Sequence, residues 1–248
     1  MGVKQFFDNH RPLILNSQRF PKKLCILVLA PHPDDFDEIC ITLRFFKENG
    51  NSIYVAVVSS GASGVEDTFC SPPTKKNKAE IREKEQQASC AFFGLPASHL
   101  TFLHLKEDPM GHPMDTDKNY QQVKRHFLRI HPDMVFLPHG NDTNLGHQWT
   151  YSIFSKIASQ AGYPITAFLN KDPKTIQMRT DLYNPFDERA AQWKAHLLRF
   201  HQSQHQRNWN TRNIGFDERI LRVNRKIAEE CGEVVEYAEA FELEFWGE

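Results

Sequence analysis

CILVLAPHPDDFDE, residues Cys25 to Glu38, starts as an apolar run and then changes to His, Pro and a cluster of acids. No glycine-rich turn follows the run, so the stretch lacks the GxGxxG pattern that holds a dinucleotide. In open α/β sheets, ligands gather just beyond the carboxyl ends of the strands. If the run is a strand, the polar residues after Ala30 are therefore expected to lie in a ligand site.

Similar apolar runs alternate with amphipathic segments along the 248 residues, which predicts an α/β fold with a mostly parallel sheet. Most runs lack a two-residue period, as expected for strands that are covered on both faces. The last two runs could instead pair as a hairpin. The predicted strands are Leu24–Ala30, Ile53–Ser59, Leu100–Leu105, Met134–Pro138, Ile165–Leu169 and Ile176–Leu182.

Helical periodicity occupies several of the segments between the strands, and the first helix is predicted to end at a Gly94 cap. Gly61–Lys78 has no apolar period and contains Pro72 and Pro73, so it is predicted to be a long surface loop of the kind that often forms a lid. The predicted helices are Ala79–Phe93, Tyr120–Ile130, Trp149–Ala161, about Phe186–Gln204 and Asp217–Cys231.

The composition restricts the partners and the compartment. A formal net charge of −1 gives no field that would gather nucleic acid or an anionic membrane. The five cysteines are scattered without a CxxC pair, which argues against a disulfide framework and favours a reducing cytoplasm. No apolar run approaches the roughly 20 residues that span a bilayer. We expect residues 1–23 to form an N-terminal extension and residues 24–248 to form a single domain.

The HPDD cluster has the composition of a metal site. His32 and Asp35 are separated by a turn stiffened by Pro33, a spacing that lets an imidazole nitrogen and a carboxylate oxygen meet at one metal ion. Asp34 would point elsewhere and could act as a base. Alternatively, Asp34 or Asp35 caps the following helix, as Asp residues often do.

A second polar cluster, LPHGNDTNLGHQW, follows the fourth predicted strand and is expected on the same rim of the sheet. His147 stands just before the helix that carries Trp149, so its side chain can face the first loop. Two histidines and one carboxylate from separate strand ends form a three-ligand set that leaves a position open for water. Asp142 is expected either to orient His147 or to cap its helix.

These motifs together resemble the PIG-L/LmbE-like zinc-dependent N-acetylglucosaminide deacetylases. The resemblance runs from about Leu24 to Gln204. It rests on APHPDD after the first strand, SSGASG after the second, Arg82 and Glu85 in an RxxE pattern, PHGNDTNLGH after the fourth strand, and KAHLLRFHQSQ in a late helix.

The resemblance implies a Rossmann-like sheet and a site in which His32, Asp35 and His147 bind zinc while Asp34 is the general base. It also implies an amide substrate on a small sugar. Asn144 is a candidate for supporting catalysis.

Other residues have both a functional and a structural interpretation. His201 is a catalytic candidate by family likeness, although such a helical histidine is more often solvated or capping. Arg82 could bind the sugar or could pair with Glu85 on the same helix face. His139 could support the site or could be a surface or core residue. Gly61 and Gly64 suit a close approach of substrate to the backbone, and they suit an ordinary turn equally well.

The chain departs from the family pattern at three positions. Phe36 stands where the family usually has Glu, Gly146 where an Asp usually precedes the last histidine, and Asn144 where some members carry another His. These changes leave the three ligands and the base intact, but they affect the partner that orients His147 and the choice of substrate.

We therefore predict a hydrolase that removes an acetyl group from an N-acetylated amino sugar or its conjugate by attack of a zinc-bound water. One alternative is a metal-dependent phosphoesterase, which would want two metals and basic groups for phosphate, whereas Arg82 is the only Lys or Arg near the motifs. Another is a non-catalytic sugar or nucleotide-binding module on the same fold. The expected partner is a small amino sugar, and the sequence leaves open whether copies of the chain assemble.

Overall fold

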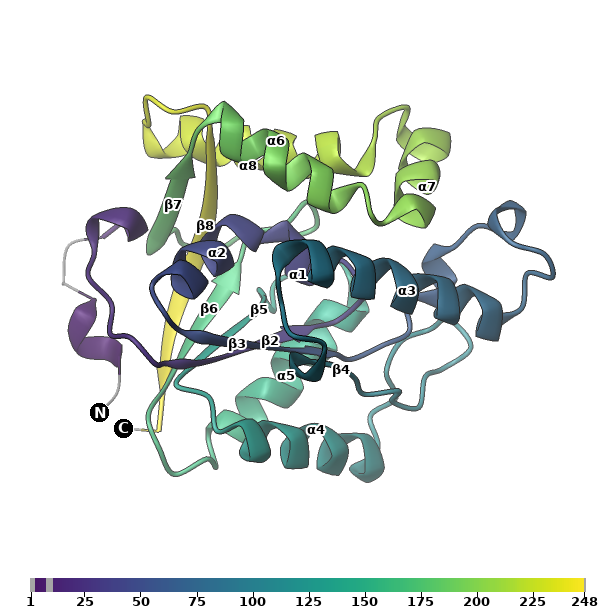
Figure 1. Ribbon diagram of the computed structural model, residues 1–248. Coiled ribbons are helices and arrows are strands. Elements are labelled where there is room, and N and C mark those ends of the chain that lie inside the picture. Colours follow the sequence, from purple (N-terminus) through teal and green to yellow (C-terminus); the bar gives the residue numbers. More distant parts are fainter. Residues whose placement is uncertain (1–2, 8–10, 248) are drawn as a thin grey trace.

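The computed structural model describes residues 3–7 and 11–247, and it shows an eight-stranded sheet with helices on both faces (Figure 1). The strand order is β1-β7-β8-β6-β5-β2-β3-β4. The strands are β1 (Leu13–Ile14), β2 (Cys25–Ala30), β3 (Ser52–Val57), β4 (Leu100–Phe102), β5 (Met134–Pro138), β6 (Ile165–Asn170), β7 (Leu182–Phe186) and β8 (Tyr237–Trp246).

The pairing is parallel except along β8, which runs antiparallel to both β6 and β7. The predicted mostly parallel α/β sheet is thus confirmed. Part of the predicted N-terminal extension joins this sheet, because β1 pairs with β7 in parallel. Residues 1–2 and 8–10 of that extension, and residue 248, lie outside the described residues.

Helices α4 and α5 lie on one side of the sheet, and α1, α2, α3 and α6 lie on the other (Figure 1). The helices are α1 (Asp35–Glu38), α2 (Cys40–Glu48), α3 (Lys75–Phe93), α4 (Asp117–Ile130), α5 (Leu145–Ala158), α6 (Glu188–Leu198), α7 (Gln202–Arg212) and α8 (Phe216–Cys231), with short 3-10 turns at Val3–Phe6, Leu15–Ser17, η3 (Ala62–Gly64), Asp67–Phe69 and Ala97–His99. No helix in the described part of the chain combines the length and the apolar character needed to cross a bilayer.

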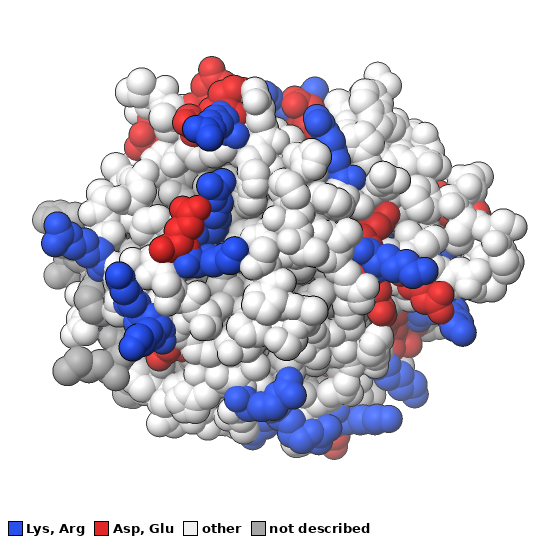
Figure 2. All heavy atoms as spheres, in the orientation of Figure 1, with Lys and Arg blue, Asp and Glu red and all other residues white. Residues whose placement is uncertain are grey.

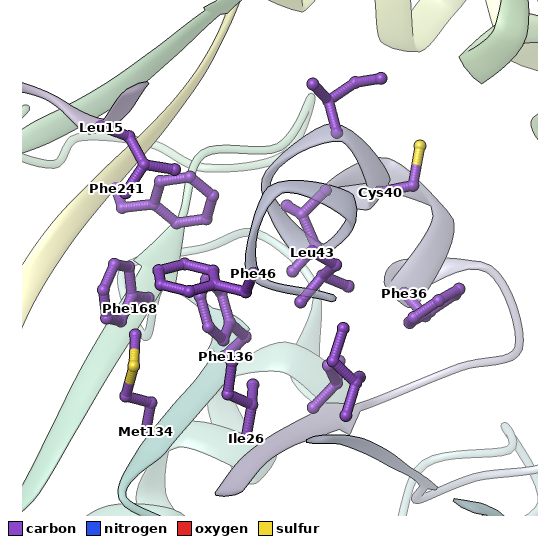
Figure 3. Packing of buried hydrophobic residues seen from close by; sticks show 14 of the residues in the cluster. Leu15, Ile26, Phe36, Cys40, Leu43, Phe46, Met134, Phe136, Phe168 and Phe241 are labelled. Carbon is purple, nitrogen blue, oxygen red and sulfur yellow. The ribbon is translucent and has the colours of Figure 1, made fainter. Parts of the chain in front are cut away.

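Aromatic packing holds α2 against the centre of the sheet. Phe46 on α2 points at Phe136 on β5 and Phe168 on β6 (Figure 3), with ring centroids 5.8 and 6.0 Å away. The two strand residues stack on each other at 4.4 Å. Because all three rings are fully buried, we expect truncation of any one to cost about 3–5 kcal/mol. This packing fixes α1 and α2 directly after the HPDD loop.

Two predictions fail where tertiary contacts decide the local structure. The strand predicted at Ile176–Leu182 is wrong, because the strand is β7, which starts at Leu182, while Ile176 is exposed. The alternative hairpin is also wrong, because β8 lies between β6 and β7. The C-terminal strand that separates them was not predicted.

The single helix predicted over about 186–204 is wrong, because the chain breaks into α6 and α7 at His201, whose backbone is not helical (φ −83°, ψ 63°). His201 Nε2 lies 2.7 Å from Asp37 Oδ2, and the Ser203 N–H donates to Glu85 at 2.7 Å. These buried polar contacts, made to α1 and α3, compensate for the interrupted helix. The break turns α7 toward the loop after β3.

Charges of both signs are spread over the face shown in Figure 2, around a largely uncharged centre. This agrees with the formal net charge of −1. The expectation that no long-range field attracts polyanions rests on this near balance.

Candidate metal centre

The segments after β2 and β5 bring together the three predicted ligands. His32 lies in the loop after β2 and Asp35 begins α1, while His147 lies in the first turn of α5 rather than just before that helix. His32 Nδ1 lies 3.2 Å from Asp35 Oδ2, and His147 Nε2 lies 3.4 Å from Asp35 Oδ1. One potential ligand atom from each residue falls within 4.8 Å of the others. Two imidazoles and a carboxylate at this separation suit one divalent ion with further positions open to water or substrate.

His147 is oriented by two buried carboxylates. Its Nδ1 lies 3.1 Å from Asp142 Oδ2 and 3.1 Å from Asp172 Oδ2. Its Nε2 is buried and has no hydrogen bond within the described residues. Carboxylates on one ring nitrogen fix the tautomer that leaves the other free to bind metal. The free Nε2 therefore fits a metal ligand. Gly146 replaces the Asp that usually precedes this histidine in the family, and Asp142 and Asp172 supply the carboxylate contact to Nδ1 instead.

The electrostatics of Asp35 and His32 agree with this assignment, whereas His147 has to lose a proton before it binds a metal. Burial raises the pKa of Asp35, but the charge of His147 and the close contacts with both imidazoles outweigh it and hold that pKa well below its usual range. Burial, His147 and Lys174 lower the pKa of His32 despite Asp35. Burial lowers the pKa of His147, yet the charge of Asp35 and bonds to the flanking carboxylates raise it well above its usual range. Asp35 is thus ionised and His32 neutral, as a metal site requires.

Several carboxylates lie close together around the three ligands. Glu38 faces the same space, and burial together with the charges of Asp172, Asp35 and Asp34 raises its pKa well above the usual range. The charge of Lys174 offsets part of this rise. A divalent cation between the carboxylates would relieve the repulsion, so the donor set fits a bound metal.

Asp34 is held beside the ligands by Arg82. Its Oδ2 lies 3.0 Å from Arg82 Nη2, a group that also bonds the carbonyl oxygen of Pro33. The backbone of Asp34 has φ 144° and ψ −24°, a strained conformation of the kind that clusters at functional sites. Its side chain makes no capping bond to α1, so the helix-cap alternative does not apply to it.

A cavity of about 260 Å³ opens beside these groups. Of the predicted site residues, it is lined by His32, Asp34, Asp35, Gly61, Gly64, Arg82 and Asn144. Gly61 has φ +63°, and a Cβ there would lie 2.9 Å from Pro33 Cδ. His147 lies behind the cavity wall and is fully buried.

Besides His147, two predicted residues lie outside the cavity lining. His201 is fully buried and contacts Asp37 on α1. His139 Nε2 lies 3.3 Å from Glu242 Oε2 on β8, and its Nδ1 accepts the Asn141 N–H. Any effect of these two residues on the reacting atoms must therefore pass through other groups.

Sequence reasoning missed several residues that the fold brings here. Asp172 and Lys174 follow β6, so the strand-end rule could have found them. Arg207, Arg212 and Arg219 line the far side of the cavity from α7 and α8, where no strand end marks them. The expectation that Arg82 is the only basic group near the motifs is therefore wrong.

Several solved structures resemble the chain. The N,N'-diacetylchitobiose deacetylase from Pyrococcus horikoshii has a TM-score of 0.70 at 18% identity, covering 88% of this chain and 83% of that one. The 4-carboxy-2-hydroxymuconate hydratase GalB from Pseudomonas putida KT2440 scores 0.67 at 18% identity, covering 89% and 95%. A zinc-inhibited form of teicoplanin deacetylase Orf2 scores 0.65 at 12% identity, covering 89% and 98%. At these identities the likeness shows the fold alone.

A search of curated protein sequences returns no match. A family model, in contrast, matches residues 27–158, and its description is GlcNAc-PI de-N-acetylase. The matched range exceeds half of the chain and contains both loops of the metal centre. The chain belongs to the PIG-L family.

Proposed function

We propose that the protein is a metal-dependent N-deacetylase that releases acetate from an N-acetylated amino sugar or its conjugate. The observation that carries the proposal is the group formed by His32, Asp35 and His147, whose ligand atoms lie within 4.8 Å of one another beside a cavity that also contains Asp34. Family membership supports the same reaction.

The residues divide the work as follows. His32, Asp35 and His147 would hold a divalent metal, which when bound would supply Lewis acidity and lower the pKa of water to about 7. Asp34 takes the proton from the attacking water and returns it to the leaving amine. Arg82 keeps the Asp34 carboxylate in place, which makes it a positioning residue. Asn144, whose Oδ1 accepts the Gly146 N–H, sets the start of α5 and so the place of His147.

We propose zinc as the metal because imidazole and carboxylate donors suit it. The same donors suit other divalent ions, and the related teicoplanin deacetylase is described in a zinc-inhibited form. Metal-free protein should therefore be reloaded separately with zinc, iron(II), cobalt and manganese. Maximal acetate release with iron(II) or manganese, and inhibition by zinc, would reject zinc while leaving the ligand set unchanged.

The test is acetate release from N-acetylglucosamine and its conjugates, with and without chelator. Asp34→Asn should keep the metal and lose about 10²- to 10⁴-fold in turnover, as expected for loss of a general base. His147→Ala should lose the metal itself. His104→Asn, which alters an imidazole that is 67% exposed and outside the cavity, is the matched control. Unchanged turnover in Asp34→Asn would remove the proposed base.

Other functions on this fold are distinguished in the same preparation. A phosphoesterase would release phosphate from aryl phosphates, and a binding module would turn over nothing. The likeness to a hydratase shows that the fold does not fix the reaction. A hydratase would release no acetate and would add water to a conjugated acid instead.

A further inference from the structure

One end of the cavity is strongly cationic. Arg207 and Arg212 project from α7, Arg219 projects from the first turns of α8, and all three line the same cavity as His32 and Asp35. The acids of the lining come from the HPDD loop and α1, whereas these three arginines come from α7 and α8. The metal ligands and the three arginines thus reach the cavity from different parts of the chain.

The three arginines have no carboxylate partner among the described residues. Asp217, the nearest acid at the start of α8, is engaged by Arg199 at 2.6 Å and faces His205 at 3.4 Å. Glu218 is engaged by Arg222 at 3.0 Å and by Arg225 at 3.1 Å. These two acids are thus already paired, and Glu66, which lies against α7, accepts from Asn210 at 2.6 Å.

These guanidinium groups also repel one another. Burial, followed by the charges of Arg219 and Arg207, lowers the pKa of Arg212. Arg207 and Arg212 are exposed and Arg219 is half-buried, so solvent screens part of this repulsion, and an anion bound between the three groups would remove more of it.

The cationic end continues directly into the substrate space. A Cβ on Gly64 would lie 3.2 Å from Gln204 Nε2 and 3.3 Å from Arg207 Nη1, so this glycine of η3 lets α7 close over the loop. Gly61, at the other side of η3, touches Arg82 in the same way, with Arg82 Nε 3.1 Å from its Cβ position. One short loop therefore joins the Asp34 end of the cavity to the arginine end.

We propose that Arg207, Arg212 and Arg219 form a phosphate subsite, and that the substrate is an N-acetylated amino sugar that carries a phosphate ester. This rests on the proposed deacetylase function. The amide lies at the metal end and the phosphate at the arginine end. Guanidinium groups bind phosphate oxygens in pairs of parallel hydrogen bonds.

A phosphate ester fits better than a single carboxylate for two reasons. Three guanidinium groups from two helices can each meet a different terminal oxygen, and a phosphomonoester carries about −1.5 to −2 charges at neutral pH. The cavity volume of about 260 Å³ lies at the low end for ligand pockets, which suits a monosaccharide phosphate better than a long conjugate.

The kinetic test compares kcat/KM for N-acetylglucosamine, its 1-phosphate, its 6-phosphate and N-acetylmuramic acid, which carries a carboxylate. We expect one phosphate ester to be preferred over the neutral sugar by at least about tenfold, and Arg212→Gln or Arg219→Gln to reduce that preference by about tenfold each. Arg125→Gln, an exposed arginine on α4 outside the cavity, should leave the preference unchanged. Equal kcat/KM values, a preference for the carboxylate, or insensitivity to the arginine variants would overturn the subsite.

A binding test separates this proposal from the deacetylase itself. Calorimetric titration of wild-type protein with glucosamine 6-phosphate, glucosamine 1-phosphate and glucosamine needs no turnover. Tighter binding of a phosphate ester, weakened in Arg212→Gln and by added salt, supports the subsite even if no acetate is ever released. Acetate release from neutral sugars with no phosphate binding rejects the subsite and leaves the deacetylase standing. Unfolding transitions of the variants show that each is folded.

Discussion

Removing the two acids that flank His147 should weaken metal binding in a strongly non-additive way. Asp172 Oδ1 already accepts the N–H groups of Lys174 and Thr175, at 2.7 and 2.8 Å, so only Oδ2 faces the imidazole. In Asp172→Asn, those backbone bonds hold the amide oxygen in place and turn the amide NH2 toward His147 Nδ1. Asp142→Asn does the same, because Asp142 Oδ1 accepts the Asn144 N–H at 2.6 Å.

The expected loss of metal affinity follows from the single proton on His147 Nδ1. His147 Nδ1–H needs a single acceptor, so the remaining carboxylate should keep the loss in each single variant below about twofold, well short of the roughly 10- to 100-fold that accompanies complete loss of such a contact. In Asp142→Asn/Asp172→Asn, two NH2 groups face Nδ1 and favour the tautomer that carries its proton on Nε2. That tautomer cannot bind metal through Nε2, and the loss should reach about 100-fold, or about 2.7 kcal/mol.

The pH dependence gives the same reasoning a second readout. The flanking carboxylates and Asp35 raise the pKa of His147 in the metal-free protein, so a proton competes with the metal above neutral pH. A raised folded pKa stabilises the fold below the unfolded value of about 6.5 and loses that stabilisation as pH rises through the folded value. Metal affinity should therefore keep rising above pH 7 in the wild type and level off earlier in the double variant.

Affinities are best compared at their high-pH limits, where proton competition is smallest. Competition with a fluorescent chelator measures each dissociation constant between pH 6 and 9, and circular dichroism checks the fold. Asp117→Asn, an exposed acid at the start of α4, is the control. Additive single-variant losses, or a double variant within threefold of the wild type at high pH, would refute the tautomer argument.

Three further predictions concern the frame around the site. Lys194→Met should lower the free energy of unfolding in urea by about 3–5 kcal/mol, because it leaves the Glu239 carboxylate buried without its cation, 2.7 Å away in the wild type. Adding Glu239→Gln to that variant should recover part of the lost free energy of unfolding. Lys76→Met, which removes the cation of an exposed ion pair, should cost under about 1 kcal/mol. Equal losses in Lys194→Met, in the double variant and in Lys76→Met would contradict this. Gly61→Ala should lower the free energy of unfolding by about 1–2 kcal/mol, because the φ of Gly61 is +63°. An unchanged midpoint of thermal unfolding would contradict this. Glu85→Gln should raise KM for a phosphorylated substrate more than for the neutral sugar, and an equal rise for both would show that the carboxylate does not position α7.

The metal site could be predicted from the sequence because each ligand lies in a segment that follows the end of a strand. His32, Asp34 and Asp35 follow one buried strand and His147 follows another, so the strand-end rule alone brings the two loops to one rim. The same rule applied to β6 would have found Asp172. What local rules could not supply is the sheet order, since β8 comes from the far end of the chain to separate β6 from β7.

The cationic end was out of reach for a different physical reason. Arg207 and Arg212 face the cavity only because the late helix breaks at His201, and that break depends on buried partners distant in sequence. Nothing in the spacing of the segment records those partners, so periodicity alone extended one helix through it.

Arg82 and Glu85, the RxxE pair on α3, hold the two ends of the cavity at a fixed distance from each other. Arg82 bonds the Asp34 carboxylate at 3.0 Å, and one turn later Glu85 accepts both the Ser203 N–H and the Ser203 hydroxyl at 2.7 Å. Ser203 lies in the first turn of α7, where a carboxylate satisfies an unpaired N–H and favours the positive end of the helix. The Arg82 Nη1 to Glu85 Oε2 distance of 3.6 Å makes the intrahelical ion pair secondary to these two outward contacts. A rigid helix thus connects the proposed base to the start of the helix that carries Arg207 and Arg212. Because a substrate that spans the cavity must meet both ends at once, a fixed distance between them selects for the length of the substrate as well as for its charge.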